Sequence, residues 1–313
     1  MVGYSPGEKE LGHSMQMLAG SLSGMLTRAC TQPLDVIKIR FQLQVEPISP
    51  KSPTSKYQGG IHSITTILRE ESYLAFWKGH LSAQILSAVF MAVEFTSFEM
   101  LTKYFYLNYS GEQNKTVQHF ISGAGAGTTA TVVSYPLDVL RTRFVAQGNK
   151  KVYTSFAQGL NHIYCSDGIK GYYKGLGAAI CQTAPQSALY FGLYQLFKRI
   201  LDNLRVDSSR DAVTATVGAA AGISAKLVSY PFDTSKRRLQ VIGFENARKE
   251  FGVTRHYNGI FSYLTTSVSE EGIRGLYKGA SLSIIKSGVT TSLYFFIYEK
   301  MCKIIRHNMS EEC

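Results

Sequence analysis

The sequence predicts an all-α membrane protein built from three copies of one helical unit of about 100 residues. One motif combines proline, aspartate and basic residues and occurs three times, at spacings of 103 and 95 residues. A second motif, also present three times, is an acidic residue followed six positions later by aromatic-lysine-glycine. The first motif begins at Pro33, Pro136 and Pro231 and the second at Glu71, Asp167 and Glu271, each preceded by Tyr57, Tyr153 or Tyr257 at a distance of 14 residues. One copy would be weak evidence, but three copies in register indicate a triplicated body.

Composition favours the membrane over a soluble enzyme. Hydrophobic residues make up 45% of the chain and charged residues only 18%, while the net charge is +11. Such a charge points to an anionic partner. Nucleic acid is excluded because the aromatic residues lie inside apolar segments rather than along a basic stripe. The five cysteines have no metal-ligand or disulfide spacing, so we expect no metal site. No Ser/His/Asp or paired-carboxylate constellation stands out either, and we expect no catalytic residue and no cofactor.

Six long helices are expected, separated in each unit by a loop and a short amphipathic helix. None contains a clean run of 18 apolar residues, as a single lipid-embedded helix would. A helix with lipid on one side and water on the other needs only a half-apolar surface, as where Ile85, Leu86 and Val89 alternate with Ser82 and Gln84. The long segments are 14–44, 80–106, 117–147, 176–201, 212–242 and 280–306. They form one domain, 1–313, with repeats at 14–106, 117–203 and 212–306.

The first long helix of each unit carries the features that assemble a bundle. Glycines spaced by four, as at Gly20 and Gly24, let helix backbones approach closely in lipid, and the same spacing recurs at 123/127 and 218/222. A proline deep in each of these helices kinks it toward a common axis. The charges that follow each proline share one helix face, because they are three residues apart. They are Asp35 with Lys38, Asp138 with Arg141, and Asp233 with Lys236.

Such pairs often lie on a solvated surface. At a converging kink in a membrane, a ring of ion pairs between helices is favoured, because charge at membrane depth needs a partner or water.

Together these motifs resemble those of the mitochondrial carrier family (solute carrier family 25) over nearly the whole chain; only Ser72, where the family has glycine, departs from them. The resemblance implies six tilted transmembrane helices around a central cavity, three short helices on the matrix side, and a multi-pass location in the inner mitochondrial membrane. It also implies that the six charges form a matrix gate braced by Gln42 and Gln240. Val145 occupies the third brace position and cannot donate. We further expect a monomer and bound anionic lipid such as cardiolipin.

The family's opposite, cytoplasmic gate is incomplete in this sequence. Its motif is aromatic-acidic-x-x-basic near the ends of the even-numbered helices. The expected gate residues are Glu99, Lys198, Glu299 and Gln195. One ion pair, such as Glu99 with Lys198, is available at most. We therefore expect a weak cytoplasmic lock and a populated outward-open state.

Three cations are expected to bind the cargo. Seven residues past the glycine of each aromatic-lysine-glycine, the three repeats have Leu86, Gln182 and Lys286. Five residues before each kink proline, they have Arg28, Thr131 and Lys226. Arg28, Lys226 and Lys286 are predicted to share one cavity without an adjacent acid. Such a cluster attracts a multiply charged anion, and phosphate groups fit it best. Each cation taken alone could instead extend to a lipid headgroup.

Other polar residues have open roles. Glu94 either faces a cationic or donor part of the solute or pairs with a cavity lysine. Gln84, Gln182 and Thr183, with Gln186, either contact the solute or bond between helices.

Several segments resemble those of the thiamine pyrophosphate-carrying branch of the family, and within them the residues outside the general motif are the specific ones. The segments are 1–4, 35–44, 75–80, 138–144 with 146–148, and 238–241 with 243–248. The resemblance implies alternating-access transport of thiamine pyrophosphate, with nucleotides as exchange partners. An adenine nucleotide or coenzyme A carrier is the alternative within the family. The sequence shows no catalytic constellation, which argues against a membrane-bound enzyme. A non-transporting scaffold would not need three gate motifs.

Overall fold

The computed structural model describes residues 13–49, 55–108, 115–148, 151–203, 211–245, 247–248 and 255–311. Within these ranges the chain is helical and contains no strand. The elements are α1 (His13–Leu43), α2 (Gly60–Glu70), η1 (Tyr73–Trp77), α3 (His80–Asn108), α4 (Lys115–Ala146), α5 (Phe156–Gly171), α6 (Leu176–Asn203), α7 (Asp211–Gln240), α8 (Ile260–Glu271), α9 (Ile273–Leu276) and α10 (Ala280–Glu311). The six predicted long helices are confirmed. Segment 1–4, used in the resemblance, lies outside the described residues.

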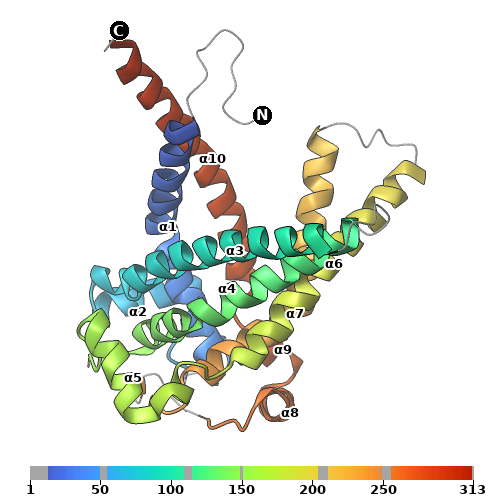
Figure 1. Ribbon diagram of the computed structural model, residues 1–313. Helices are drawn as coiled ribbons and strands as arrows, with labels where there is room; N and C mark the ends of the chain where they lie inside the picture. The colour runs from blue at the N-terminus through green and yellow to red at the C-terminus, as the bar shows by residue number, and fades with distance from the viewer. Residues whose placement is uncertain are drawn as a thin grey trace.

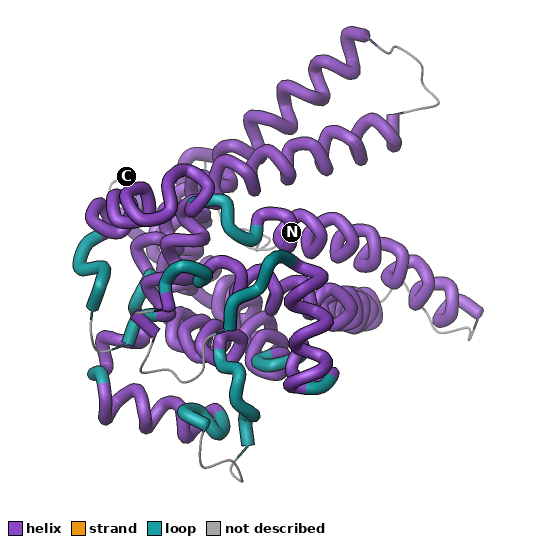
Figure 2. The backbone as a smooth tube through the Cα atoms, turned by 90° about the horizontal axis from the view of Figure 1, so that it is seen from below, coloured by secondary structure: helices purple, strands orange, loops and turns teal. Residues whose placement is uncertain are grey.

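The long helices pack as three pairs that diverge from a common base (Figures 1 and 2). The pairs are α1 with α10, α3 with α4, and α6 with α7. Each pair joins two different repeats, so no repeat forms a separate body. Some of the predicted glycine contacts are made: a Cβ on Gly20 would lie 3.6 Å from the Tyr294 hydroxyl, and one on Gly218 would lie 3.8 Å from the Tyr190 hydroxyl.

The aromatic residue of each second motif packs near the kink proline of its own repeat. Pro33 lies inside α1 and has no N–H to offer the carbonyl of Ala29, four residues before it. The indole Nε1 of Trp77 donates to that carbonyl at 3.0 Å. The second and third repeats place a tyrosine at this position, and it stacks on the tyrosine before the proline. The ring centroids are 6.4 Å apart for Tyr135 and Tyr173 and 6.1 Å apart for Tyr230 and Tyr277.

The glycine after each aromatic-lysine pair has a steric reason. Gly79 has φ 73°, in the left-handed region that favours glycine. A Cβ at this position would lie 3.0 Å from the carbonyl oxygen of Arg141, in the next repeat. Gly279 repeats this arrangement, with φ 80° and the Lys38 carbonyl 3.2 Å away. Each glycine therefore lets a loop of one repeat touch the kinked helix of the next.

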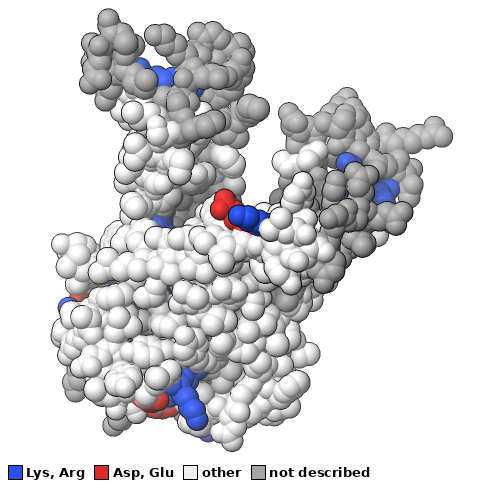
Figure 3. Space-filling model, in the orientation of Figure 1, with Lys and Arg blue, Asp and Glu red and all other residues white. Residues whose placement is uncertain are grey.

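The core lies at the base, where the C-terminal halves of α1, α4 and α7 meet. Its largest cluster takes residues from all three repeats, including Ile39, Val145 and Phe244. Many large hydrophobic side chains of the long helices are exposed, and the face in Figure 3 shows broad uncharged stretches over the described residues. Among the described residues, two segments are apolar and long enough to span a membrane by composition, Tyr73–Asn108 and Ile273–Arg306.

Candidate functional site

Six charged residues just after the kink prolines form the charged ring, which joins α1, α4 and α7. Every pair links two different repeats, and all three carboxylates are buried. The pairs are Lys38–Asp233, Arg141–Asp35 and Lys236–Asp138, each with a nitrogen–oxygen distance of 2.7 Å. These contacts tie the three kinked helices together at the base. The ring's role as a gate stays a prediction.

Two further cations enter the ring. Arg237 occupies a variable position of the first motif, and its Nη1 lies 2.9 Å from Asp138. Lys286 of α10 reaches Asp35, with Nζ 2.5 Å from Oδ1. The expectation that Lys286 has no adjacent acid is therefore wrong. Sequence spacing could not reveal this pair, because Lys286 lies on α10, outside the repeated motif that places the ring residues.

The two predicted brace glutamines contact the ring, and the third position does not. The amide of Gln42 donates to Asp233 at 3.1 Å, and that of Gln240 donates to Asp138 at 2.9 Å. Both side chains are fully buried, so each amide is held in place. Val145 is equally buried but offers only hydrocarbon to its surroundings. Consequently Asp35 is the one ring carboxylate without a glutamine partner among the described residues.

A second layer of charge lies below the ring, once in each repeat. In the first repeat, Arg40 binds both oxygens of Glu71, at 2.6 and 2.9 Å, and Lys78 binds the same carboxylate at 2.5 Å. Burial opposes ionisation of Glu71, but the hydrogen bonds and charges of its two partners hold its pKa below the usual value. Lys78 also donates to the carbonyls of Gln147 and Gly148, at the end of the next repeat's helix.

The other two repeats contain equivalent clusters. Asp167 binds Arg143 and Lys174, and Glu271 binds Arg238 and Lys278. We did not predict these clusters, although the constant spacing of tyrosine, acid and aromatic was the signal for them.

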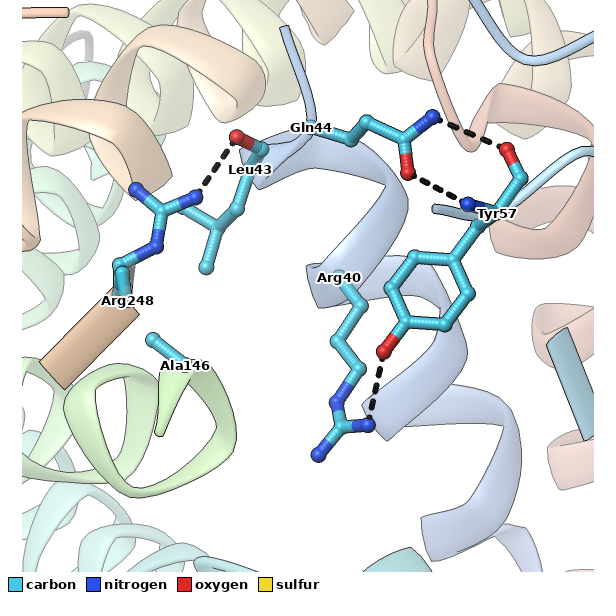
Figure 4. A pocket seen from close by; sticks show the side chains of 6 residues that line it. All are labelled: Arg40, Leu43, Gln44, Tyr57, Ala146 and Arg248. Atoms are coloured by element: carbon cyan, nitrogen blue, oxygen red, sulfur yellow. Dashed lines mark hydrogen bonds between the residues drawn. The ribbon is translucent and has the colours of Figure 1, made fainter. Parts of the chain in front are cut away.

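The close-up in Figure 4 shows a small cavity in this lower layer. Its volume is about 10 Å³, room for roughly one water molecule. It is lined by Arg40, Leu43, Gln44, Tyr57, Ala146 and Arg248. The Arg248 guanidinium donates to the Leu43 carbonyl at 2.9 Å, which ties the third repeat to the first. The cavity is far too small for an organic anion and belongs to the packing of the base.

The predicted cargo cations lie next to the ring. Lys226 interacts electrostatically with Lys286, Lys38 and Asp233, and Arg28 does so with Arg141. All three cations are partly buried. Arg28 donates to the Ala83 carbonyl at 2.7 Å, and Lys226 donates to the Ser287 hydroxyl at 2.7 Å. The three cations therefore gather in one region, and neither Arg28 nor Lys226 has an ion pair among the described residues.

Two of the neutral residues of the predicted site donate hydrogen bonds to helix carbonyls. Gln84 bonds between helices, because its amide donates to the Met25 carbonyl of α1 at 3.1 Å. The Thr183 hydroxyl donates to a carbonyl of its own helix at 2.9 Å, that of Ala179. Gln182 is partly buried on α6.

Glu94 occupies the repeat position that holds tyrosine in the other two repeats. Its Oε1 would be 3.9 Å from a Cβ on Gly127, just as Tyr190 and Tyr294 lie against glycines of their partner helices. In the described part of the chain Glu94 forms no ion pair with a lysine. The structure thus places a partly buried carboxylate between α3 and α4.

The opposite gate residues are apart in this conformation. Glu99, Lys198, Glu299 and Gln195 are all exposed. No ion pair joins them within the described ranges. In the described ranges, ion pairs therefore join the helices at the charged ring and none joins these four residues.

Comparison with known proteins gives a consistent result. The family profile described as "Mitochondrial carrier protein" matches residues 9–109, 112–204 and 209–309. The mitochondrial thiamine pyrophosphate carriers of Macaca fascicularis and Homo sapiens are each 40% identical to this chain, with 97% of both chains covered. The mitochondrial thiamine pyrophosphate carrier 1 of Coccidioides immitis is 35% identical, with 95% of both covered.

Proposed function

The chain belongs to the mitochondrial carrier family, and on that premise we propose that it transports thiamine pyrophosphate across the inner mitochondrial membrane by alternating access. The observation that carries the cargo assignment is the group of three cations, Arg28, Lys226 and Lys286, beside the charged ring. The names of its relatives from primates and a fungus support the same cargo.

The chemistry of the cargo matches this site. A pyrophosphate offers several charged oxygens, and lysine and arginine bind phosphate through short charge-assisted hydrogen bonds. In this structure Arg28 donates a hydrogen bond to a backbone carbonyl, and Lys226 donates one to a serine hydroxyl. These are weaker partners than a phosphate oxygen, so the cargo can displace them. The thiazolium ring carries a positive charge, and Glu94 is the acid in the α3 helix suited to face it.

Alternating access follows from the two ends of the molecule. The charged ring closes one end with three ion pairs, while the other end has none among the described gate residues. Cargo enters from the unlocked side, and its binding offsets the loss of the ring as the opposite end closes. Nucleotides are the proposed exchange partners, a monomer is the proposed working unit, and anionic lipid such as cardiolipin is the proposed lipid partner. The protein acts as a carrier rather than as an enzyme.

The test is uptake of labelled thiamine pyrophosphate into liposomes that contain the purified protein. We expect saturable uptake that unlabelled thiamine pyrophosphate competes away and that free thiamine, which lacks the phosphates, does not. ATP and coenzyme A serve as competitors for the alternative cargo. Robust nucleotide exchange without thiamine pyrophosphate uptake would replace the cargo assignment. Absence of transport for every solute would favour a scaffold.

A further inference from the structure

The three carboxylates of the charged ring are not held in the same way. Asp233 and Asp138 each accept a hydrogen bond from a glutamine amide of the neighbouring helix. For Asp35 the matching position is Val145, which has no donor. Asp35 instead receives the ammonium group of Lys286, at 2.5 Å.

We propose that Lys286 takes the place of the missing glutamine, bracing the Asp35–Arg141 ion pair, and that bound cargo withdraws it. The proposal rests on the proposed function, because it gives a cargo-binding residue a second task. It makes the Asp35–Arg141 pair the one ring contact that responds directly to the cargo.

The geometry allows Lys286 to serve both partners. The Asp35 side chain is 8% exposed, whereas that of Lys286 is 27% exposed, so the ammonium can be approached while the carboxylate is shielded. Lys226 donates to the Ser283 carbonyl and the Ser287 hydroxyl of α10, and Ser287 is the residue after Lys286, so an anion attracted to one lysine lies near the other. An ammonium is a compact charge with three donors that rotate freely, and it can exchange one oxygen partner for another.

Withdrawal of Lys286 weakens one ring contact selectively. Asp138 would keep its bonds to Lys236, Arg237 and Gln240, because none of these residues is a proposed cargo-binding cation. Among the ion pairs of the described residues, Asp35 would keep only that with Arg141. Because a ligand shifts an equilibrium only through its different affinity for the two states, this exchange of partners gives the cargo a direct means of favouring the open ring.

Lys226 provides a matched control. It is a lysine in the same cation cluster, but it donates to the Ser287 hydroxyl and the Ser283 carbonyl at 2.7 and 3.2 Å. We therefore expect Lys226 to bind cargo but not to brace the ring. A cation that serves cargo binding alone should behave like Lys226.

The first experiment measures Tm in detergent without ligand. We expect Lys286→Met to lower Tm by about 2–6 °C and Lys226→Met to change it by less than about 1 °C. In a double-mutant cycle with Asp35→Asn, the Lys286 change should lose most of its effect, whereas the Lys226 change should stay additive. Equal effects of the two lysine variants, or an additive Lys286–Asp35 cycle, would overturn the proposal.

The second experiment installs the absent glutamine. Val145→Gln should restore Tm to the Lys286→Met protein, because a glutamine there can donate to Asp35 as Gln42 does to Asp233. In the wild-type background it should lower the maximal exchange rate of thiamine pyrophosphate by about 3- to 10-fold while leaving KM within about 2-fold, since the ring no longer depends on Lys286. A purely disruptive substitution would lower Tm in both backgrounds, and that result would count against the proposal.

Repeating the cycle with saturating thiamine pyrophosphate separates the two proposals. If the cargo withdraws Lys286, the Lys286–Asp35 coupling seen without ligand should disappear. Coupling that persists unchanged would refute withdrawal by the cargo. If thiamine pyrophosphate leaves the Tm of the wild type unchanged, the cargo assignment fails, and the ligand-free cycle then decides the brace by itself.

Discussion

Replacing Glu71 with glutamine removes one negative charge from between two cations and keeps the shape of the side chain. In the native protein both carboxylate oxygens are used: Arg40 binds them at 2.6 and 2.9 Å, and Lys78 adds a contact of 2.5 Å. The Arg40 and Glu71 side chains are only 1% and 4% exposed. A glutamine can accept with one oxygen, but it turns an NH₂ group toward a buried guanidinium.

The magnitude follows from this burial. Breaking a buried ion pair from one side leaves an uncompensated charge and costs about 3–5 kcal/mol, whereas an exposed pair is worth about 0–1 kcal/mol. For a chain of this size, each kcal/mol corresponds to roughly 2 °C in Tm. Glu71→Gln should therefore lower Tm by about 6–10 °C.

The assay is thermal unfolding of the purified protein in detergent, followed by intrinsic fluorescence. The adjacent Glu70 supplies the control: it pairs with Lys56 at 2.8 Å, but its side chain is 49% exposed. Glu70→Gln should shift Tm by no more than about 2 °C. Equal shifts for the two variants would refute the argument that burial of the Glu71 cluster sets its contribution.

Three further predictions concern backbone strain, pH dependence and cargo recognition. Ser72 has φ 138° where the second repeat has glycine, so Ser72→Gly should relieve strain and raise Tm by about 2–4 °C in the same assay. Burial opposes ionisation of Glu71 and Glu271, but their arginine and lysine partners hold both pKa values below the ordinary 4.5. The stability that these two carboxylates contribute is therefore complete above pH 4.5 and is lost as the pH falls through the lower folded-state pKa. A profile of Tm against pH should show a plateau with a drop on the acid side. If Glu94 faces the thiazolium ring, Glu94→Gln should raise KM for thiamine pyrophosphate by about 5- to 10-fold and leave inhibition by inorganic pyrophosphate unchanged, whereas a role in helix packing would affect both alike.

Much of the fold was accessible from the sequence because its signals are local and repeated. Helix positions follow from apolar patterning within each segment. The charged ring follows from a three-residue spacing, which puts aspartate and lysine on one face wherever the chain is helical. The repeat then identifies the partner: an aspartate of one copy needs the cation of another, as in Lys38 with Asp233.

The contacts that could not be predicted are those that break the symmetry. Arg237 occupies a position the motif leaves free, so nothing in its spacing marked it as a partner of Asp138. Lys286 meets Asp35 because a helix of the third repeat packs against a helix of the first, and only the assembled bundle brings them together. The Trp77–Ala29 hydrogen bond could not be predicted either, since it depends on how η1 lies against the kink in α1.

These asymmetric cations explain why a closed ring can still attract cargo. The three ring carboxylates of the described structure face five paired cations, and Arg28 and Lys226 add two more nearby. Among the described residues, the charged ring and the cations beside it therefore carry more positive than negative charge. A phosphate-bearing anion reduces the repulsion among these cations as it binds, so the same charges that attract the cargo are stabilised by it. Because part of this attraction acts over several ångströms through water, the apparent affinity for thiamine pyrophosphate should fall as salt rises. A variant with one cation fewer, such as Lys226→Met, should show a shallower salt dependence.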